Sequence, residues 1–278
     1  MCGIAGIFNL DGEPAPPKIL KKMTDVLAHR GPDGEGQYIN GFFGIGHRRL
    51  AIIDLSPAGH QPMVSANKQF ILSYNGEIYN FQELRAELEM LGHQFHSKTD
   101  SEVVLNSWVE WGENCVHRFN GMFAFSVWDK RTKTLFLVRD RYGIKPLYYA
   151  SWGNTFLFGS EQKAILEHPE AKNVIDKRAL LEYFTFQNIF TNRTLFKNIK
   201  LLQPASIGKL QYGKNKTLSI RHYWDYHFEE PKKVIDQYEY QNELNRLIKQ
   251  AVGRQLVTDV ELGSYLSGGM DSGTLTAI

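Results

Sequence analysis

Short apolar segments of strand length, separated by charged or glycine-containing turns, recur through the first 160 residues of the chain. Residues 3–8 are typical, because the segment is wholly apolar and begins beside a glycine. Strands of this length need a second layer to bury their apolar faces. The pattern therefore predicts an α+β fold with sheets packed on each other and covered by helices. The other expected strands are 37–46, 50–54, 69–74, 122–129, 134–139, 147–151 and 155–159.

Helices are expected where apolar residues recur at a spacing of three and four. Asn80 can cap the second of them, and Thr99 with Glu102 forms a capping box for the third, which Gly112 ends. The expected ranges are 17–28, 81–91 and 100–111.

The character of the sequence changes after residue 205. Residues 205–232 are polar with scattered Gly and Pro, which indicates a connection between domains. An amphipathic helix follows over 244–256, then a short strand over 262–266 and a glycine turn over 267–273 that leads into another helix. A strand, glycine turn and helix in this order begin an α/β domain.

The composition excludes several classes of protein. Hydrophobic residues make up 42% and charged residues 22%, as in a soluble globular protein, and the net charge of +2 gives no basic bias for nucleic acid. No apolar run reaches the roughly 18 residues of a membrane span. Cys2 and Cys115 are too few for a disulfide framework. We therefore expect a cytoplasmic protein that binds neither nucleic acid nor membrane.

Cys2 has the chemistry of an N-terminal nucleophile. Removal of Met1 would place a thiol and a free α-amine on one residue, and their unperturbed pKa values lie near ~8.5 and ~8. The amine could then accept the thiol proton near neutral pH. Taken alone, a second-position cysteine on an apolar strand is more often an ordinary core residue.

Seven motifs in a fixed order decide between these alternatives. The chain resembles the glutamine-dependent asparagine synthetase family, whose front half is a class II glutamine amidotransferase domain. The resemblance covers the whole chain and implies an N-terminal nucleophile αββα sandwich, with two antiparallel sheets between helix layers. The motifs are Cys2-Gly-Ile-Ala-Gly, His29-Arg-Gly-Pro-Asp, Gly46-His-Arg-Arg-Leu, Tyr74-Asn-Gly-Glu-Ile-Tyr, Thr99-Asp-Ser-Glu, Arg139-Asp-Arg-Tyr-Gly-Ile-Lys-Pro-Leu-Tyr and Ser267-Gly-Gly-Met-Asp-Ser.

The resemblance implies a thioester mechanism on glutamine that needs no metal or cofactor. Cys2 would attack the side-chain amide, and the Asn75 amide with the Gly76 N–H would hold the oxyanion. Without that context, Asn-Gly is a common turn signal.

The resemblance also implies an amino-acid clamp. Arg49 would bind the α-carboxylate of L-glutamine, since a guanidinium fork suits a carboxylate. Asp100, ahead of Glu77, would bind the α-ammonium, although an acid in a first helical turn also suits the helix dipole. Arg30 lies in a loop that helps to cover the glutamine site in the family.

The glycine turn near the end resembles the pyrophosphate loop of ATP pyrophosphatases. Its backbone N–H groups and serine hydroxyls would bind phosphate oxygens. In the full-length family reaction ATP and Mg serve to adenylate an acceptor carboxylate, normally aspartate, which ammonia then amidates. The expected ATP-binding residues are Ser267, Gly268, Gly269, Asp271 and Ser272. For segment 139–148 we expect buried ion pairing of Asp140 or Arg141 and assign no chemical role.

The expected division is a glutaminase domain over 2–207, a connection over 208–234 and the truncated start of a synthetase domain over 235–278. Family members continue for hundreds of residues, so we expect that this chain cannot make asparagine unaided and that Leu262, Tyr265, Leu266 and Leu275 are disordered or pair with another chain. A partner-dependent glutamine-binding subunit and hydrolysis of a different amide are the alternatives. The final ammonia acceptor, a synthetase partner and a homodimer are left open.

Overall fold

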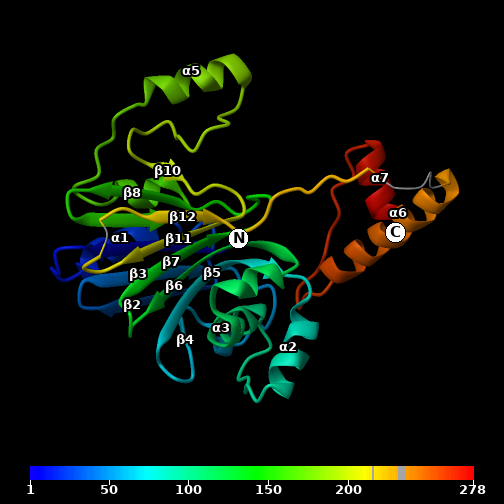
Figure 1. Cartoon of the computed structure of the whole chain (residues 1–278), viewed down its shortest axis with the longest axis horizontal. Coiled ribbons are helices and arrows are strands. Elements are labelled where there is room, and N and C mark those ends of the chain that lie inside the picture. Colours follow the sequence, from blue (N-terminus) through cyan, green and yellow to red (C-terminus); the bar gives the residue numbers. More distant parts are fainter. Residues whose placement is uncertain (215, 231–235) are drawn as a thin grey trace.

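Two antiparallel sheets of six strands form the body of the protein. The computed structural model describes residues 1–278 except 215 and 231–235 (Figure 1). The strand order is β10-β8-β9-β1-β3-β2 in the first sheet and β12-β11-β7-β6-β5-β4 in the second. Their bounds are β1 Gly3–Asn9, β2 Gly34–Asn40, β3 Phe43–Arg49, β4 Met63–Val64, β5 Phe70–Ile78, β6 Gly121–Asp129, β7 Thr134–Arg139, β8 Tyr148–Trp152, β9 Thr155–Gly159, β10 Lys200–Leu201, β11 Ser206–Gln211 and β12 Ser219–His222.

Three apolar clusters define the layers. Between the sheets, Phe8, Phe43 and Trp128 pack together, with the last two rings stacked at 4.3 Å between centroids. α1 (Pro17–Asp25) and α4 (Gln162–Leu166) cover the outer face of the first sheet. α2 (Phe81–Met90), α3 (Asp100–Trp111) and the 3-10 helix η2 (Gly112–His117) cover the second. The expected αββα sandwich is therefore confirmed.

The region after residue 36 differs from the expected strands. The segment 37–46 is not one strand, because Gly41 takes φ +58 and turns the chain between β2 and β3. Residues 50–54 form no strand either: Asp54 has φ 59, which breaks an extended segment. An irregular segment therefore follows β3, ending in the short 3-10 helix η1 (Pro57–Gly59).

The helix caps are partly as expected. The Thr99 hydroxyl accepts from Glu102 N at 3.2 Å and so caps α3. The Glu102 carboxylate instead accepts from His96 N and Ser97 N, so the capping box is not reciprocal. Asn80 is the N-cap residue of α2 as expected, but its side chain does not cap the helix: it accepts from Asn120 N at 2.9 Å and donates to Arg118 O at 3.0 Å.

The last third leaves the sandwich. In Figure 1 α5 (Lys177–Phe186) lies above the sheets, and α6 (Gln237–Gln255) and α7 (Met270–Ala277) lie to the right of them. β11 and β12 extend the second sheet to His222, whereas the connection was expected to begin at residue 208. Part of that connection, 231–235, lies outside the described residues.

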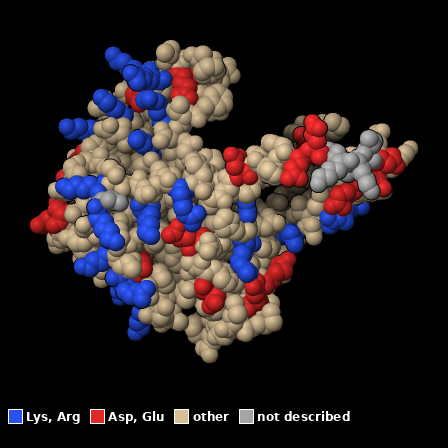
Figure 2. All heavy atoms as spheres, in the orientation of Figure 1, with Lys and Arg blue, Asp and Glu red and all other residues tan. Residues whose placement is uncertain are grey.

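The expected strand over 262–266 is not formed, and Tyr265 is 99% exposed, because no neighbouring strand lies beside it in the described structure. None of the described helices is long and apolar enough to cross a membrane. Basic and acidic side chains both occur across the face shown in Figure 2, consistent with the net charge of +2.

Candidate active site

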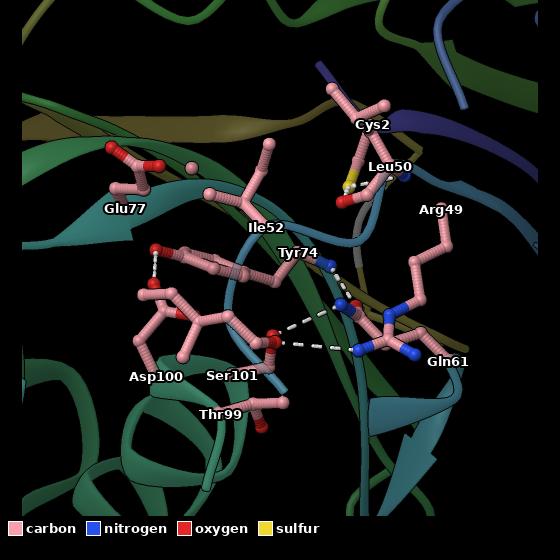
Figure 3. A pocket seen from close by; sticks show the side chains of 12 residues that line it. Cys2, Arg49, Leu50, Ile52, Gln61, Tyr74, Glu77, Thr99, Asp100 and Ser101 are labelled. Carbon is pink, nitrogen blue, oxygen red and sulfur yellow. Dashed lines mark hydrogen bonds between the residues drawn. The ribbon is translucent and has the colours of Figure 1, made fainter. Parts of the chain in front are cut away.

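One small cavity of about 40 Å³ lies where β1 begins, β3 ends and β5 passes the N-terminus of α3. Figure 3 shows polar groups of several kinds directed into it, with Glu77 and Arg49 on opposite sides of the view. The lining residues are Cys2, Arg49, Leu50, Ile52, Ile53, Gln61, Tyr74, Gly76, Glu77, Thr99, Asp100 and Ser101.

The Cys2 thiol lies in this cavity at the start of β1. Its sulfur accepts from Leu50 N at 3.4 Å and lies 3.7 Å from Leu50 O. Burial raises the pKa of the thiol, so ionisation needs a base close by. Met1 is 55% exposed. The residue that precedes the thiol is thus accessible for removal.

Arg49 ends β3 with its guanidinium fixed by backbone carbonyls. It donates to Ser56 O at 2.8 Å and also to Asp54 O, both in the segment after β3. A Cβ at Gly59 would lie 2.1 Å from Nη2, so a larger residue there would push the guanidinium out of this position. The orientation of the guanidinium is therefore determined by the backbone of 53–59 rather than by a paired acid.

Asn75 and Gly76 lie next to each other on β5. Gly76 lines the cavity, and a Cβ there would lie 2.4 Å from Met122 O on β6. Asn75 is buried and is absent from the lining, yet within the described part of the chain its Nδ2 has no hydrogen-bond partner. A buried amide without an acceptor is costly. An oxygen atom of a bound ligand could satisfy it.

Two acidic side chains lie on the other side of the cavity. Asp100 accepts from the Tyr74 hydroxyl at 2.6 Å and from Ile78 N at 3.0 Å. Burial raises the pKa of Asp100 to about 6 against the effect of these bonds. Burial also raises the pKa of Glu77, and the nearby Lys145 opposes that shift. A ligand ammonium would stabilise the ionised form of both groups.

Two buried polar residues were missed at the sequence level. Gln61 accepts from Tyr74 N at 2.7 Å and donates to the Ser101 hydroxyl at 3.1 Å, which ties β5 to α3. His47 is fully buried beside Tyr74 O, and burial lowers its pKa to about 4. A glutamine in an irregular loop carries no sequence signal. His47 lies inside the motif Gly46-His-Arg-Arg-Leu, and that position is the signal that points to it.

The structure places Arg30 beside the nucleophile and not in the cavity lining. Its Nε donates to Cys2 O at 2.9 Å, and its Nη1 donates to Glu161 at 2.9 Å. Burial would raise the pKa of Glu161, but hydrogen bonds from Arg30 and its neighbours lower it to about 2. Arg30 thus links the backbone of Cys2 to an acid that is ionised at neutral pH.

Segment 139–148 does not contain the expected ion pair. Asp140 is fully buried and accepts backbone N–H groups of Phe123, Tyr142, Ile144 and Lys145 at 3.0–3.2 Å. Arg141 donates to the backbone carbonyls of His117 and Phe119. Both side chains therefore bond the backbone, and the default of a buried ion pair was wrong.

The glycine turn over 267–272 lies apart from the cavity and is exposed. Gly268 has φ +82, and the Ser267 and Ser272 hydroxyls lie 3.0 Å apart. Gly269 is the N-cap of α7, and Asp271 lies in its first turn. Among the described residues, no cluster of three or more His, Cys, Asp and Glu side chains could hold a metal ion.

Comparison with known proteins identifies the family. A family model described as a glutamine amidotransferase domain matches residues 1–224. The chain belongs to the glutamine amidotransferase family. A second model, described as asparagine synthase, matches residues 243–278. The resemblance inferred from the motifs is confirmed.

Curated relatives agree with this assignment, and a solved structure shares the fold. Asparagine synthetase [glutamine-hydrolyzing] 3 of Bacillus subtilis is 42% identical over 100% of this chain and 45% of its own length. A putative asparagine synthetase [glutamine-hydrolyzing] 2 of Methanocaldococcus jannaschii is 38% identical over 100% of this chain and 56% of its own. The chain thus spans about half the length of these relatives. Glutamine phosphoribosylpyrophosphate amidotransferase of B. subtilis shares the fold, with a TM-score of 0.57 at 19% identity over 80% of this chain and 49% of that one.

Proposed function

We propose that this amidotransferase domain hydrolyses L-glutamine to glutamate and ammonia through a thioester on Cys2. The observation that supports it is the convergence of a buried thiol, a fixed guanidinium and a buried carboxylate on one cavity. Arg49 would bind the α-carboxylate, and Asp100 with Glu77 would bind the α-ammonium. This geometry suits a free amino acid and argues against hydrolysis of an unrelated amide.

The chemistry proceeds in two steps on one residue. After loss of Met1, the Cys2 amine takes the thiol proton, and the thiolate attacks the Cδ amide carbon of glutamine. The Asn75 amide and Gly76 N–H stabilise the oxyanion. The Cys2 ammonium then gives its proton to the NH2 group, the C–N bond breaks, and ammonia leaves as the thioester forms. Water then attacks the thioester, and glutamate departs as the thiol re-forms. No metal or cofactor takes part in this half.

The complete enzyme would use the ammonia that this domain releases. The curated relatives are named glutamine-hydrolyzing asparagine synthetases, and residues 243–278 match that family. We assign ATP-dependent amidation of aspartate to the complete enzyme, in the cytoplasm, where two unpaired cysteines are stable. The turn before α7 suits a phosphate group. Ser267, Ser272 and the N–H groups of Gly268 and Gly269 would hold it, and Asp271 is the kind of ligand that Mg prefers.

Glutamate release from L-glutamine without ATP tests the glutaminase. The protein should first be shown by mass spectrometry to lack Met1. We expect steady release by the wild-type chain and none by Cys2→Ala. If neither releases glutamate although both bind L-glutamine, the domain is a glutamine-binding subunit that requires a synthetase partner, and the proposal fails.

A further inference from the structure

The segment that matches the synthetase family touches the loop that orients Arg49. Asp259 Oδ2 accepts from Asp54 N at 2.7 Å, and Asp259 N donates to Ile52 O at 3.0 Å. The Thr258 hydroxyl lies 3.4 Å from the same carbonyl. Residues more than 200 positions apart thus form a short two-sided pairing beside the glutamine cavity.

The loop over residues 52–56, which Asp259 contacts, also binds the guanidinium of Arg49. Arg49 donates to the carbonyls of Asp54 and Ser56, and Ile52 and Ile53 line the cavity with it. Asp54 occupies the left-handed region at φ 59, a conformation that a non-glycine residue adopts only when its surroundings fix it. Its Oδ2 accepts from Lys98 N at 2.7 Å, and its own N–H is fixed by Asp259.

A second contact joins α6 to α2. Arg254, near the end of α6, approaches Glu83 in the first turn of α2 at 3.5 Å. α2 follows β5, which carries Gly76 and Glu77. The segment 254–259 therefore contacts both the loop after β3 and helix α2, and Figure 1 shows the lower end of α6 close to α2.

We propose that Asp259 is a positioning residue for glutamine binding, which acts through the 52–56 loop on Arg49. The inference rests on the proposed function of the cavity. A charged acceptor on Asp54 N fixes the strained turn, and the turn directs two carbonyls at the guanidinium. Movement of the synthetase segment would release the turn and weaken the hold on the glutamine α-carboxylate. Glutamine binding and the state of the synthetase segment are thereby linked.

The steady-state kinetics of Asp259→Ala test this link in the full chain. We expect KM for L-glutamine to rise about tenfold while kcat stays within about twofold. The variant should weaken binding of the ground state and of the transition state by the same amount, which raises KM and leaves kcat unchanged. Asp259→Asn keeps an acceptor oxygen, so its KM should lie between those of the wild type and Asp259→Ala. Glu261→Ala is the matched control: this carboxylate lies two residues along and is exposed, and it makes no hydrogen bond within the described residues. It should leave both constants unchanged.

Hydrogen exchange gives a readout that does not need glutaminase activity. Backbone amides of residues 51–58 should exchange at least about fivefold faster in Asp259→Ala than in the wild type or Glu261→Ala, because the bond to Asp54 N is lost. Unchanged exchange in this segment would overturn the inference. So would a lower kcat and melting temperature with an unchanged KM, which would give Asp259 a stabilising role only. If the wild type releases no glutamate, the proposed function fails, and exchange alone decides the coupling. If Asp259→Ala does not fold, Asp259→Asn takes its place in both measurements.

Discussion

Asp100 combines complete burial with a position opposite Arg49 in the glutamine cavity, so its charge state should control substrate binding. Its pKa is raised from 3.8 to about 6 by burial. In the proposed function, only the ionised form of Asp100 attracts the glutamine ammonium. We expect the dissociation constant of L-glutamine for Cys2→Ala, which binds without turnover, to rise about tenfold per pH unit below about 6. Isothermal titration between pH 4.5 and 8 measures it.

The raised pKa of Asp100 also predicts how the stability of the ligand-free protein depends on pH. The unfolded chain releases the Asp100 proton near 3.8, before the folded chain does near 6. The contribution of this group to stability is therefore full below about pH 4 and is lost as the pH rises to about 6.

Asp100→Asn in the Cys2→Ala background should remove the pH dependence of glutamine binding between pH 5 and 7. A slope that persists in this double variant would assign the titration to another group.

Asn75 should affect the chemical step more than binding or stability. Its buried Nδ2 has no partner among the described residues, so truncation removes no protein hydrogen bond from that atom. We expect Asn75→Ala to lower kcat for glutamine hydrolysis by about 10²- to 10³-fold, the usual effect of losing one oxyanion donor. KM and the melting temperature should change little. A variant with normal kcat would exclude Asn75 from the oxyanion site.

Single residues were predictable where a motif specifies chemistry. Cys2, Arg49 and Asp100 do line one cavity, although nothing in the sequence showed that Asp100 is bound by Tyr74. Arg30 was expected over the site but lies against the backbone of Cys2, because its partner Glu161 is 131 residues away. Contacts of that separation leave no local pattern in the sequence.

At the scale of elements, the closeness of β5 and β6 requires glycine at position 76. A methyl group there would meet Met122 O at 2.4 Å and Phe123 Cα at 2.8 Å, and both are backbone atoms that cannot rotate away. We expect Gly76→Ala to destabilise the chain by about 1–3 kcal/mol or more, as overpacking does. Chemical denaturation followed by tryptophan fluorescence measures the change.

The matched control is Gly253→Ala in α6. The added methyl group meets nothing within 4 Å, and a glycine inside a helix costs about 0.5–1 kcal/mol relative to alanine. This variant should be neutral or more stable. Equal losses in both variants would show that the closeness of β5 and β6 is not what destabilises Gly76→Ala.

Most elements could be predicted because their apolar spacing is local. β1, β7, β9 and α3 lie close to their expected ranges. The segment 50–54 has strand-like composition, but its backbone is turned at Asp54 by bonds to Lys98 and Asp259 that are remote in sequence. The segment 262–266 also has strand composition, and it forms no strand because a strand needs a neighbour to pair with. Contacts between residues remote in sequence therefore determine the backbone of 50–54, and the lack of a pairing strand among the described residues explains 262–266.

At the scale of the whole molecule, the two candidate ligand sites differ in how completely they are built. The glutamine cavity draws on β1, β3, β5 and α3, all held by the sandwich core. The turn before α7 is exposed, its Ser267 and Ser272 hydroxyls lie within hydrogen-bond distance of each other, and Leu266 beside it is 65% exposed. A ligand that binds only the folded state stabilises it by about 2.7 kcal/mol at a hundredfold excess over its dissociation constant.

L-Glutamine and MgATP should therefore affect unfolding differently in Cys2→Ala, which prevents turnover. We expect saturating L-glutamine to raise the melting temperature by several degrees, since about 1 kcal/mol corresponds to about 2–4 °C in a chain of this size. MgATP should leave it unchanged, because an isolated turn offers phosphate contacts without a pocket for the rest of the nucleotide. Differential scanning calorimetry with D-glutamine and MgAMP as controls separates specific binding from ionic effects. A rise with MgATP that MgAMP does not give would show that residues 267–272 already hold the triphosphate, and the strand over 262–266 would then be unnecessary for nucleotide binding.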